Sequence, residues 1–473
     1  MIALQISFWV LLFVVPFLLA IAAASSTILA GPYVRYAIYP YLAVLMFFTA
    51  GNYGVVTNGA MTSTIYSRGT GVLFFGFVNL YLYWLGMVVL FNMLWHKRSP
   101  PVAGVRKYLL FFVLLYFVYI CFGLYFKQPF FLIISQTGVL NVFNMTVFVY
   151  VMLRVFNDQK SVDELIRFFL VCAMVRGIFG LVRFAFFGGD PANYYANFQD
   201  INVKLTFFDI NDSIIAGMAS FLSAWRLFDR DPADTPRARL MYWAMLVVGI
   251  LVILFSYRRT AWLGLIPPAL LLVWWHRQRI NFFLAIPVIV MIMGGILMLW
   301  LARFHGDAGH HADLLAMLFP DATASGHFSL KSHRFFELRL ALDTLRQHWL
   351  VGVGPWGLYQ WSWNPDVNFH NGVFNFVHSA ILHVWLKTGL IGLTLFVAAL
   401  LASTVAAFHA LKQINVPRWR GLAMTGFVGL TLFMPDILFG TPIIEYRTMQ
   451  VMGFVLVLPY LARYAFESNQ ARA

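Results

Sequence analysis

The sequence is poor in charged residues and in cysteine. Only 11% of its 473 residues are charged, against 61% that are hydrophobic, and no soluble domain of this size needs so much apolar surface for one core. Cys121 and Cys172 both fall in apolar stretches, so the sequence supports neither a disulfide framework nor a thiolate metal site. Apolar runs of about 20 residues, long enough to cross a bilayer, recur along nearly the whole chain. We therefore expect one all-α polytopic membrane domain over residues 1–473.

Acidic residues are fewer than basic ones, 19 against 33, which gives a net charge of +14. Most Lys and Arg flank apolar stretches, so we expect membrane lipids or a phosphate-bearing substrate as partners, and no nucleic acid. We expect about 12 transmembrane helices. The basic connections alternate along the chain and should face the cytoplasm: His96–Lys107, Lys160–Arg167, Arg226–Arg239, His276–Arg279 and Lys412–Arg420.

One outward connection, residues 304–377, is far longer than the others, and a loop of that length is usually functional or disordered. Most of the 12 histidines fall in or beside it. Arg339 and Asp343 are expected to pair along one side of a helix in this loop. Apolar residues recur on its other side at spacings of three and four, which predicts an amphipathic helix at the membrane surface: Phe335, Leu338, Leu342, Leu345 and Trp349.

Several basic residues fall on the outward side, where the positive-inside rule predicts few. Ser256 to Thr260 form a turn between two spans, in which the guanidinium of Arg258 or Arg259 can offer paired donors to a pyrophosphate. Contact with lipid headgroups is the alternative, because arginines at span ends often extend to the interface. The remaining outward basic residues are read in the same two ways: Lys331, Arg334, Arg339 and Arg447.

Arg176 and Arg183 stand seven residues apart in one span, hence near one helix face. An unpaired charge at that depth would be costly. Either these arginines line a functional polar cavity, or they form internal ion pairs with one of three carboxylates: Asp209, Asp212 or Asp436.

A glycine-rich turn, residues 350–357, closes the predicted amphipathic helix, and Gly352 and Gly354 would permit close backbone approach. His378 and Ser379 then open the next span. A neutral imidazole at such a boundary can take a proton from an acceptor hydroxyl near neutral pH. His310 and His311 lie on a flexible Gly-Ala stretch that makes a poor metal geometry, so we expect no metal site.

Three segments resemble, in order and spacing, the O-antigen ligase and polymerase superfamily. They are SYRRTAWLG at 256–264, WLVGVGP at 349–355, and His-Ser with LKTGLIG at 378–392. That superfamily carries a serine-arginine turn between spans, a large periplasmic loop with a Gly-x-Gly-Pro turn, and a histidine before the final spans. The resemblance covers essentially the full chain.

Carried over by position, the superfamily's catalytic histidine falls on His378 and its turn arginine on Arg258 or Arg259. Its loop arginine falls on Arg334, with Arg339 as rival. The usual His-Asn dipeptide is His-Ser here, which leaves the base in place but changes the neighbouring hydrogen bond at Ser379. Gly352 and Gly354 would contact substrate, while Arg176, Arg183 and Asp436 are possible supporting residues.

The resemblance implies a fold related to membrane glycosyltransferases that use polyprenyl-phosphosugar donors. The donor would be a polyprenyl (undecaprenyl) pyrophosphate-linked glycan and the acceptor lipid A-core oligosaccharide, with no metal or other cofactor. The enzyme would lie in the bacterial inner membrane, its active site on the periplasmic side. An inverting single displacement fits, because no carboxylate nucleophile is evident.

Within the superfamily, we favour the ligase over the O-antigen polymerase because the loop is compact, with one amphipathic helix. The absence of an appended soluble domain also weighs against the protein-targeting members. A lipid or polysaccharide transporter is the alternative from another class, but it would bury charges through the bilayer rather than gather them on one face.

Overall fold

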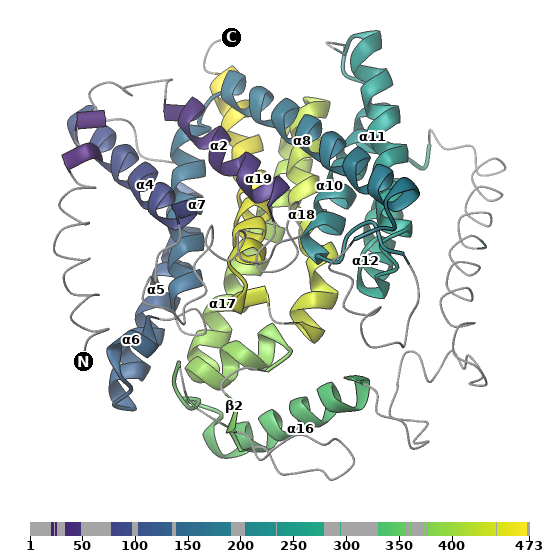
Figure 1. Cartoon of the computed structure of the whole chain (residues 1–473). Coiled ribbons are helices and arrows are strands. Elements are labelled where there is room, and N and C mark those ends of the chain that lie inside the picture. Colours follow the sequence, from purple (N-terminus) through teal and green to yellow (C-terminus); the bar gives the residue numbers. More distant parts are fainter. Residues whose placement is uncertain are drawn as a thin grey trace, which may run out of the picture.

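The fold is seen in a computed structural model that describes residues 20–22, 24–25, 34–48, 77–96, 103–134, 139–190, 204–232, 234–278, 294, 330–355, 357, 359–360, 373–374, 377–440 and 442–470. Within these residues the chain is helical apart from one two-residue antiparallel ladder (Figure 1). The elements are α2 (Val34–Phe47), α4 (Phe77–His96), α5 (Ala103–Tyr125), α6 (Phe130–Ile133), α7 (Leu140–Val155), α8 (Gln159–Phe186), α10 (Ile210–Phe228), α11 (Pro236–Leu254), α12 (Arg259–Gly264), α13 (Ile266–His276), α16 (Leu330–His348), β1 (Tyr359–Gln360), β2 (Val373–Phe374), α17 (Ala380–Gln413), α18 (Pro417–Phe439), η4 (Pro442–Ile444) and α19 (Tyr446–Gln470).

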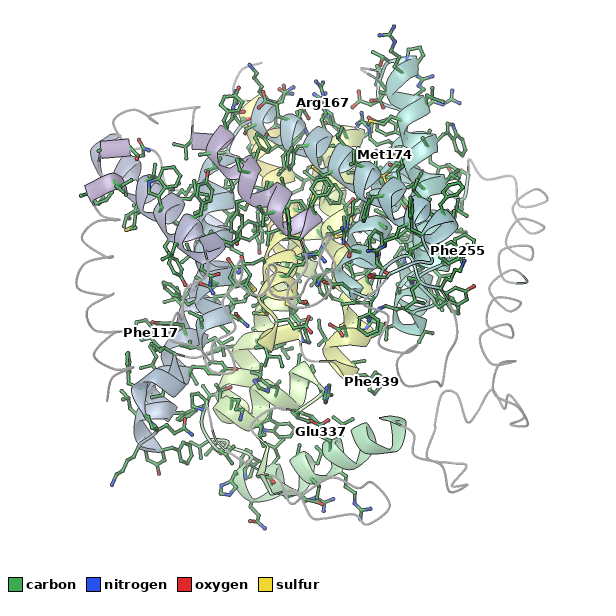
Figure 2. The ribbon with its side chains drawn as sticks, viewed as in Figure 1. Phe117, Arg167, Met174, Phe255, Glu337 and Phe439 are labelled. Atoms are coloured by element: carbon green, nitrogen blue, oxygen red, sulfur yellow. The ribbon has the colours of Figure 1, made fainter. Side chains whose placement is uncertain are left out.

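Five of these helices, α8, α11, α17, α18 and α19, are long and apolar enough to cross a membrane. Shorter apolar helices accompany them. Large apolar side chains are exposed, such as Trp243 on α11 and Phe117 on α5, which lies on the outside of the bundle (Figure 2). In water such a surface would be costly, whereas lipid solvates it. The protein is therefore a polytopic membrane protein, predominantly helical in the described residues. The predicted number of spans includes residues outside the described ranges, so it stays a prediction.

The centre of the bundle is formed by α18 and α19, with α10 and α17 packed around them (Figure 1). Nearly every residue of α19 up to Ala462 is buried, so this helix is surrounded by protein rather than by lipid. Gly429 lets α18 approach it closely, because an added Cβ would lie 2.5 Å from the Val455 side chain. Small residues at such interfaces are the usual means of close helix packing in membranes.

The basic connections before α8, α11 and α18 gather at one end of the bundle. Arg418 pairs with Asp163 at the start of α8, and Arg420 pairs with Asp229 at the end of α10. Arg226, also on α10, pairs with Asp231 at 3.2 Å. Three connections that we predicted to be cytoplasmic thus lie together, as the alternating orientation requires.

The opposite end carries α16 and the β1–β2 ladder (Figure 1). The predicted helix of the loop is observed as α16, but only part of its predicted apolar face is buried. Ala341 and Leu345 are buried against α17, whereas Leu342 is 43% exposed. The predicted pairing of Arg339 with Asp343 is wrong, because Asp343 pairs with Arg346. The predicted loop 304–377 is described only from residue 330 onward and with gaps, so its full extent stays a prediction.

Candidate active site

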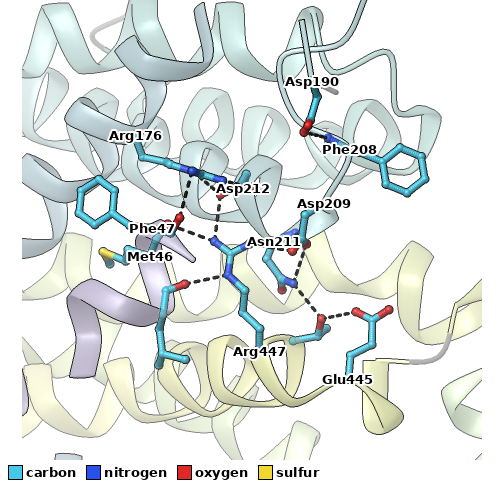
Figure 3. Close-up of polar contacts among 12 residues, drawn as sticks. Met46, Phe47, Arg176, Asp190, Phe208, Asp209, Asn211, Asp212, Glu445 and Arg447 are labelled. Atoms are coloured by element: carbon cyan, nitrogen blue, oxygen red, sulfur yellow. Dashed lines mark hydrogen bonds and ion pairs between the residues drawn. The ribbon is translucent and has the colours of Figure 1, made fainter. Parts of the chain in front are cut away.

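A buried ion network joins three helices in the middle of the bundle (Figure 3). Asp212 on α10 accepts two hydrogen bonds of 3.0 Å from Arg176 on α8, in a bidentate arrangement. It accepts a third, of 2.9 Å, from Arg447 on α19. Asp209, the N-cap of α10, accepts a bond of 2.8 Å from the same Arg447. Two guanidinium groups therefore face two carboxylates, which offsets the cost of burying each charge.

The carboxyl end of α2 also contacts this network. Arg447 donates to the carbonyl oxygens of Leu45 and Met46 at 2.7 and 3.1 Å, and Arg176 donates to that of Phe47 at 3.1 Å (Figure 3). These carbonyls are among the last of a helix and have no partner within it. Arginine side chains thus cap the carboxyl end of α2 inside the protein.

Three sequence predictions concern arginines in or beside this network. Of the two alternatives for Arg176, the internal ion pair with Asp212 is the one observed. Arg183 forms its ion pair with Asp190 at 2.8 Å, not with any carboxylate we considered. Arg447 is fully buried, so the prediction that it binds an anion on the outward side is wrong. Its charge is balanced by two carboxylates far away in sequence, Asp209 and Asp212.

The predicted arginine turn follows α11. Tyr257 adopts a left-handed backbone conformation with φ of 51°, and the backbone N–H of Arg258 donates to the Ser256 hydroxyl at 3.3 Å. The Arg258 guanidinium lies 4.8 Å from the centre of the Phe208 ring. Its Nε is buried, and the described residues supply no hydrogen-bond acceptor for it. Arg259 begins α12, but its side chain lies outside the described part, so the choice between the two arginines stays open.

Glu445 lies near this turn, directly before α19, and the sequence analysis missed it. The Thr448 hydroxyl donates to its carboxylate at 2.7 Å and itself accepts from Asn211 at 2.8 Å (Figure 3). Desolvation by the surrounding protein and the negative charges of Asp209 and Asp436 raise the pKa of Glu445 to about 7, while Arg258 acts in the opposite direction. An acidic residue immediately before an apolar span was the only signal available.

Asp436, a predicted supporting residue, lies in the last turn of α18 and is half-buried. It is close enough to influence Glu445 electrostatically. Asp436 and Arg258 thus act electrostatically, in opposite directions, on one carboxyl group. Within the described ranges, no group of three or more His, Cys, Asp or Glu side chains could hold a metal ion.

His378 lies directly before α17 and contacts α16. Its Nδ1 lies 2.7 Å from a carboxylate oxygen of Glu337, whose side chain is 9% exposed against 34% for the imidazole. Glu337 lies on the side of α16 that faces the bundle (Figure 2). The predicted Ser379 is the N-cap of α17, its hydroxyl accepting from the Leu382 N–H at 3.3 Å. This cap fixes the start of the helix, and with it the position of His378.

The glycine turn is hydrogen-bonded to α17 and so holds the loop against this helix. The Val353 N–H donates to the Leu386 carbonyl at 2.7 Å, and the buried Lys387 donates to the Gly357 carbonyl at 2.6 Å. Gly352 has φ of 68°, and an added Cβ would lie 2.4 Å from the Leu386 oxygen. Gly389 has φ of 61° and breaks the helical geometry of α17 at this contact.

Gly354 has φ of 87° and packs in the same way against Phe126 and Gln128, beyond the end of α5. The close approach that Gly352 and Gly354 permit is therefore an approach to protein. A substrate contact by either glycine stays a prediction.

The two rival loop arginines occupy different faces of α16. Arg334 lies three residues before Glu337, so its backbone position is on the same side of the helix, although its side chain lies outside the described part. Arg339 lies two residues after Glu337 and is exposed. The choice between Arg334 and Arg339 as the loop arginine stays a prediction.

Comparison with known proteins bears on most of these residues. A search of curated proteins gives no match. The sequence model of the family described as O-antigen ligase matches residues 244–397. This segment begins within α11, ends within α17, and contains Arg258, Glu337, the glycine turn and His378. Over residues 244–397, the chain is thus similar to the O-antigen ligase family.

Proposed function

We propose that the protein is an O-antigen ligase, which transfers a glycan from polyprenyl (undecaprenyl) pyrophosphate to lipid A-core oligosaccharide. The observation that carries the proposal is the contact of 2.7 Å between His378 Nδ1 and Glu337, made by residues within the family match. A carboxylate on Nδ1 selects the tautomer in which Nε2 bears a lone pair, which is the form a general base requires.

In the proposed reaction, Nε2 of His378 takes the proton of the acceptor hydroxyl while the hydroxyl oxygen attacks the anomeric carbon of the donor. The bond from that carbon to the pyrophosphate oxygen breaks, and its electron pair leaves with the pyrophosphate. One displacement inverts the anomeric configuration. The half-buried imidazole is reachable by substrate, whereas the better buried Glu337 acts only through it.

Arginines supply the positive charge that the leaving pyrophosphate needs. Arg258 is suited to this role because its buried Nε has no acceptor among the described residues and its planar group can bind phosphate oxygens in pairs. Arg259 and Arg334 are further candidates from their backbone positions. Arg176 supports the site indirectly, because its charge is held by Asp212.

The site is proposed to face the periplasm from the bacterial inner membrane. The basic connections at the far end of the bundle support this orientation by the positive-inside rule. The description of the matching family supports a ligase. A polymerase would use the same chemistry on a different acceptor, so the acceptor must be tested directly.

His378→Ala tests the proposal in a reconstituted transfer from a polyprenyl-pyrophosphate glycan to purified lipid A-core, with chelator present. General-base help is worth about 10²- to 10⁴-fold, so we expect transfer to fall by that factor. Protein abundance and donor binding should stay near normal, because a half-exposed boundary residue contributes little packing. Undiminished transfer by the alanine variant would remove His378 as the base. Chain extension without attachment to lipid A-core would identify a polymerase.

A further inference from the structure

Phe208, in the segment directly before α10, contacts the arginine turn that follows α11. The guanidinium of Arg258 lies 4.8 Å from the centre of the Phe208 ring, and both side chains are half-buried. A cation over an aromatic face is attracted by the negative charge of the ring's π-system. The ring contains no oxygen or nitrogen atom, so this attraction takes no conventional hydrogen bond from the five N–H groups of the guanidinium. Phe208 can therefore hold Arg258 without occupying its donors.

A buried ion pair fixes the backbone of Phe208. The Phe208 N–H donates to a carboxylate oxygen of Asp190 at 2.8 Å, as Figure 3 shows. The same oxygen lies 2.8 Å from the guanidinium of Arg183 on α8. Asp190 and Arg183 are only 5% and 8% exposed, and a hydrogen bond to an ionised acceptor is stronger than one between neutral groups. The end of α8 thus holds the position from which the Phe208 ring extends.

The same segment is attached to the end of α11, just before Arg258. The Thr206 N–H donates to the Phe255 carbonyl at 3.0 Å, and the Thr206 hydroxyl donates to the Val252 carbonyl at 2.9 Å. These bonds join the backbone that precedes Phe208 to the backbone that precedes Arg258. The two partners of the cation–π contact consequently extend from one hydrogen-bonded unit.

The Arg258 guanidinium needs such support if it is to bind phosphate oxygens in pairs. An arginine side chain samples many rotamers, and a bidentate contact forms only when the plane of its guanidinium is correctly oriented. The buried Nε of Arg258 has no acceptor among the described residues. The Phe208 ring, rather than a hydrogen bond at Nε, therefore restrains this end of the side chain.

We propose that Phe208 is a positioning residue, which orients the Arg258 guanidinium toward the pyrophosphate of the donor. This inference rests on the proposed function. No proton or bond changes at Phe208, and its ring acts only through Arg258, on donor binding and on the charge that develops as the pyrophosphate departs. The electron density of the ring should therefore matter as well as its shape, and its effect should vanish when the Arg258 side chain is absent.

The test is transfer from a polyprenyl-pyrophosphate glycan by the full-length protein in lipid nanodiscs, with inorganic pyrophosphate as a second probe. Phe208→Leu should lower kcat/KM for the donor about 3- to 30-fold, the range expected for loss of a cation–π contact. It should weaken competitive inhibition by pyrophosphate to a similar extent. Phe208→Tyr keeps an electron-rich ring and should stay within about twofold of the wild type. Phe186→Leu, at an exposed position at the end of α8, is the matched control and should change neither quantity.

Two comparisons separate positioning from packing. Trifluorophenylalanine in place of Phe208 has nearly the same shape but an electron-poor ring, so it should behave like Phe208→Leu if the cation–π contact carries the effect. In an Arg258→Ala background, Phe208→Leu should cost nothing further, because the contact that it removes is already lost. Wild-type kinetics for the trifluorophenylalanine protein, or full additivity of the two substitutions, would overturn the proposal and leave the transferase assignment intact. Absence of transfer by the wild-type protein would instead overturn the proposed function.

Discussion

At the scale of single residues, the Glu337–His378 contact orients the imidazole. The two residues come from α16 and α17, and the contact is 2.7 Å. A histidine that bonds only to solvent exchanges between two tautomers, and only one of them is a base at Nε2. Glu337 is therefore a positioning residue in the proposed mechanism, and its charge also stabilises the imidazolium that forms.

Glu337→Ala should lower kcat by about 10²-fold or more with little change in KM, because the carboxylate acts on the base and not on ground-state binding. Glu337→Gln keeps an acceptor for Nδ1 without the negative charge, so its rate should lie between those of the alanine variant and the wild type. Asp343→Asn, on the same helix and paired with exposed Arg346, is the matched control. A raised KM with an unchanged kcat would contradict this role.

The residue-scale predictions succeeded where the sequence itself carried the signal. Arg176 was identified as buried, and Asp212 as one of its possible partners, because a charge within an apolar span needs a counter-charge. Glu337 was missed because its partner His378 is 41 positions away. No local sequence pattern around Glu337 predicts a contact over that separation. Arg447 was misread for the same reason, since Asp209 and Asp212 approach it only in the folded bundle.

At the scale of elements, the glycine turn acts as a clasp between the loop helix α16 and the kinked helix α17. Gly352 and Gly389 are both left-handed, and each would bring an added Cβ within 2.4 Å of backbone on the other segment. The two backbones consequently lie too close for any side chain at these positions. The clasp holds α16, and with it Glu337, at the start of α17.

Gly352→Ala should therefore separate the loop from α17 and lower both transfer and thermal stability in detergent. The penalty should exceed the roughly 1–2 kcal/mol that a left-handed backbone alone costs a residue with Cβ. Gly188→Ala is a matched control, since Gly188 has φ of 79° but nothing within 4 Å of its Cβ position. Equal melting temperatures for the two variants would argue against the clasp.

Sequence patterns predicted the elements better than their contacts. The periodic apolar residues correctly indicated α16, although burial of Ala341 and Glu337 rotates its inner face away from Leu342. The apolar stretch that follows the arginine turn is divided into α12 and α13 near Leu265. The kink at Gly389 was not foreseen, because LKTGLIG has the composition of a continuous apolar helix and only the clasp requires a break there.

At the scale of the whole molecule, the buried ion network connects parts of the chain that are far apart in sequence. Arg447 of α19 contacts carbonyl oxygens more than 400 positions earlier, in α2. Its charge is shared between Asp209 and Asp212 of α10. Because lipid offers no competing hydrogen bonds, these contacts must be complete for the charges to remain in the bundle.

Arg447→Met should destabilise the folded protein by about 3–5 kcal/mol, because it leaves a buried negative charge uncompensated. Adding Asp209→Asn to this variant should restore part of the loss by balancing the charges again. Arg463→Met is the control on the same helix, where the exposed pair with Glu467 contributes little. Melting temperatures in one detergent provide the comparison, and a double variant no more stable than Arg447→Met would exclude charge balance as the cause.

The same network has a consequence for biogenesis. Asp212 and Arg176 emerge from the ribosome long before Arg447, the arginine that completes their arrangement. Until α19 enters the membrane, Asp209 and the carbonyl end of α2 must be accommodated by water, by lipid headgroups or by the insertion machinery. Final closure of the early helices is thereby coupled to the arrival of the last one, and a nascent chain truncated before α19 should remain a substrate for membrane quality-control proteases.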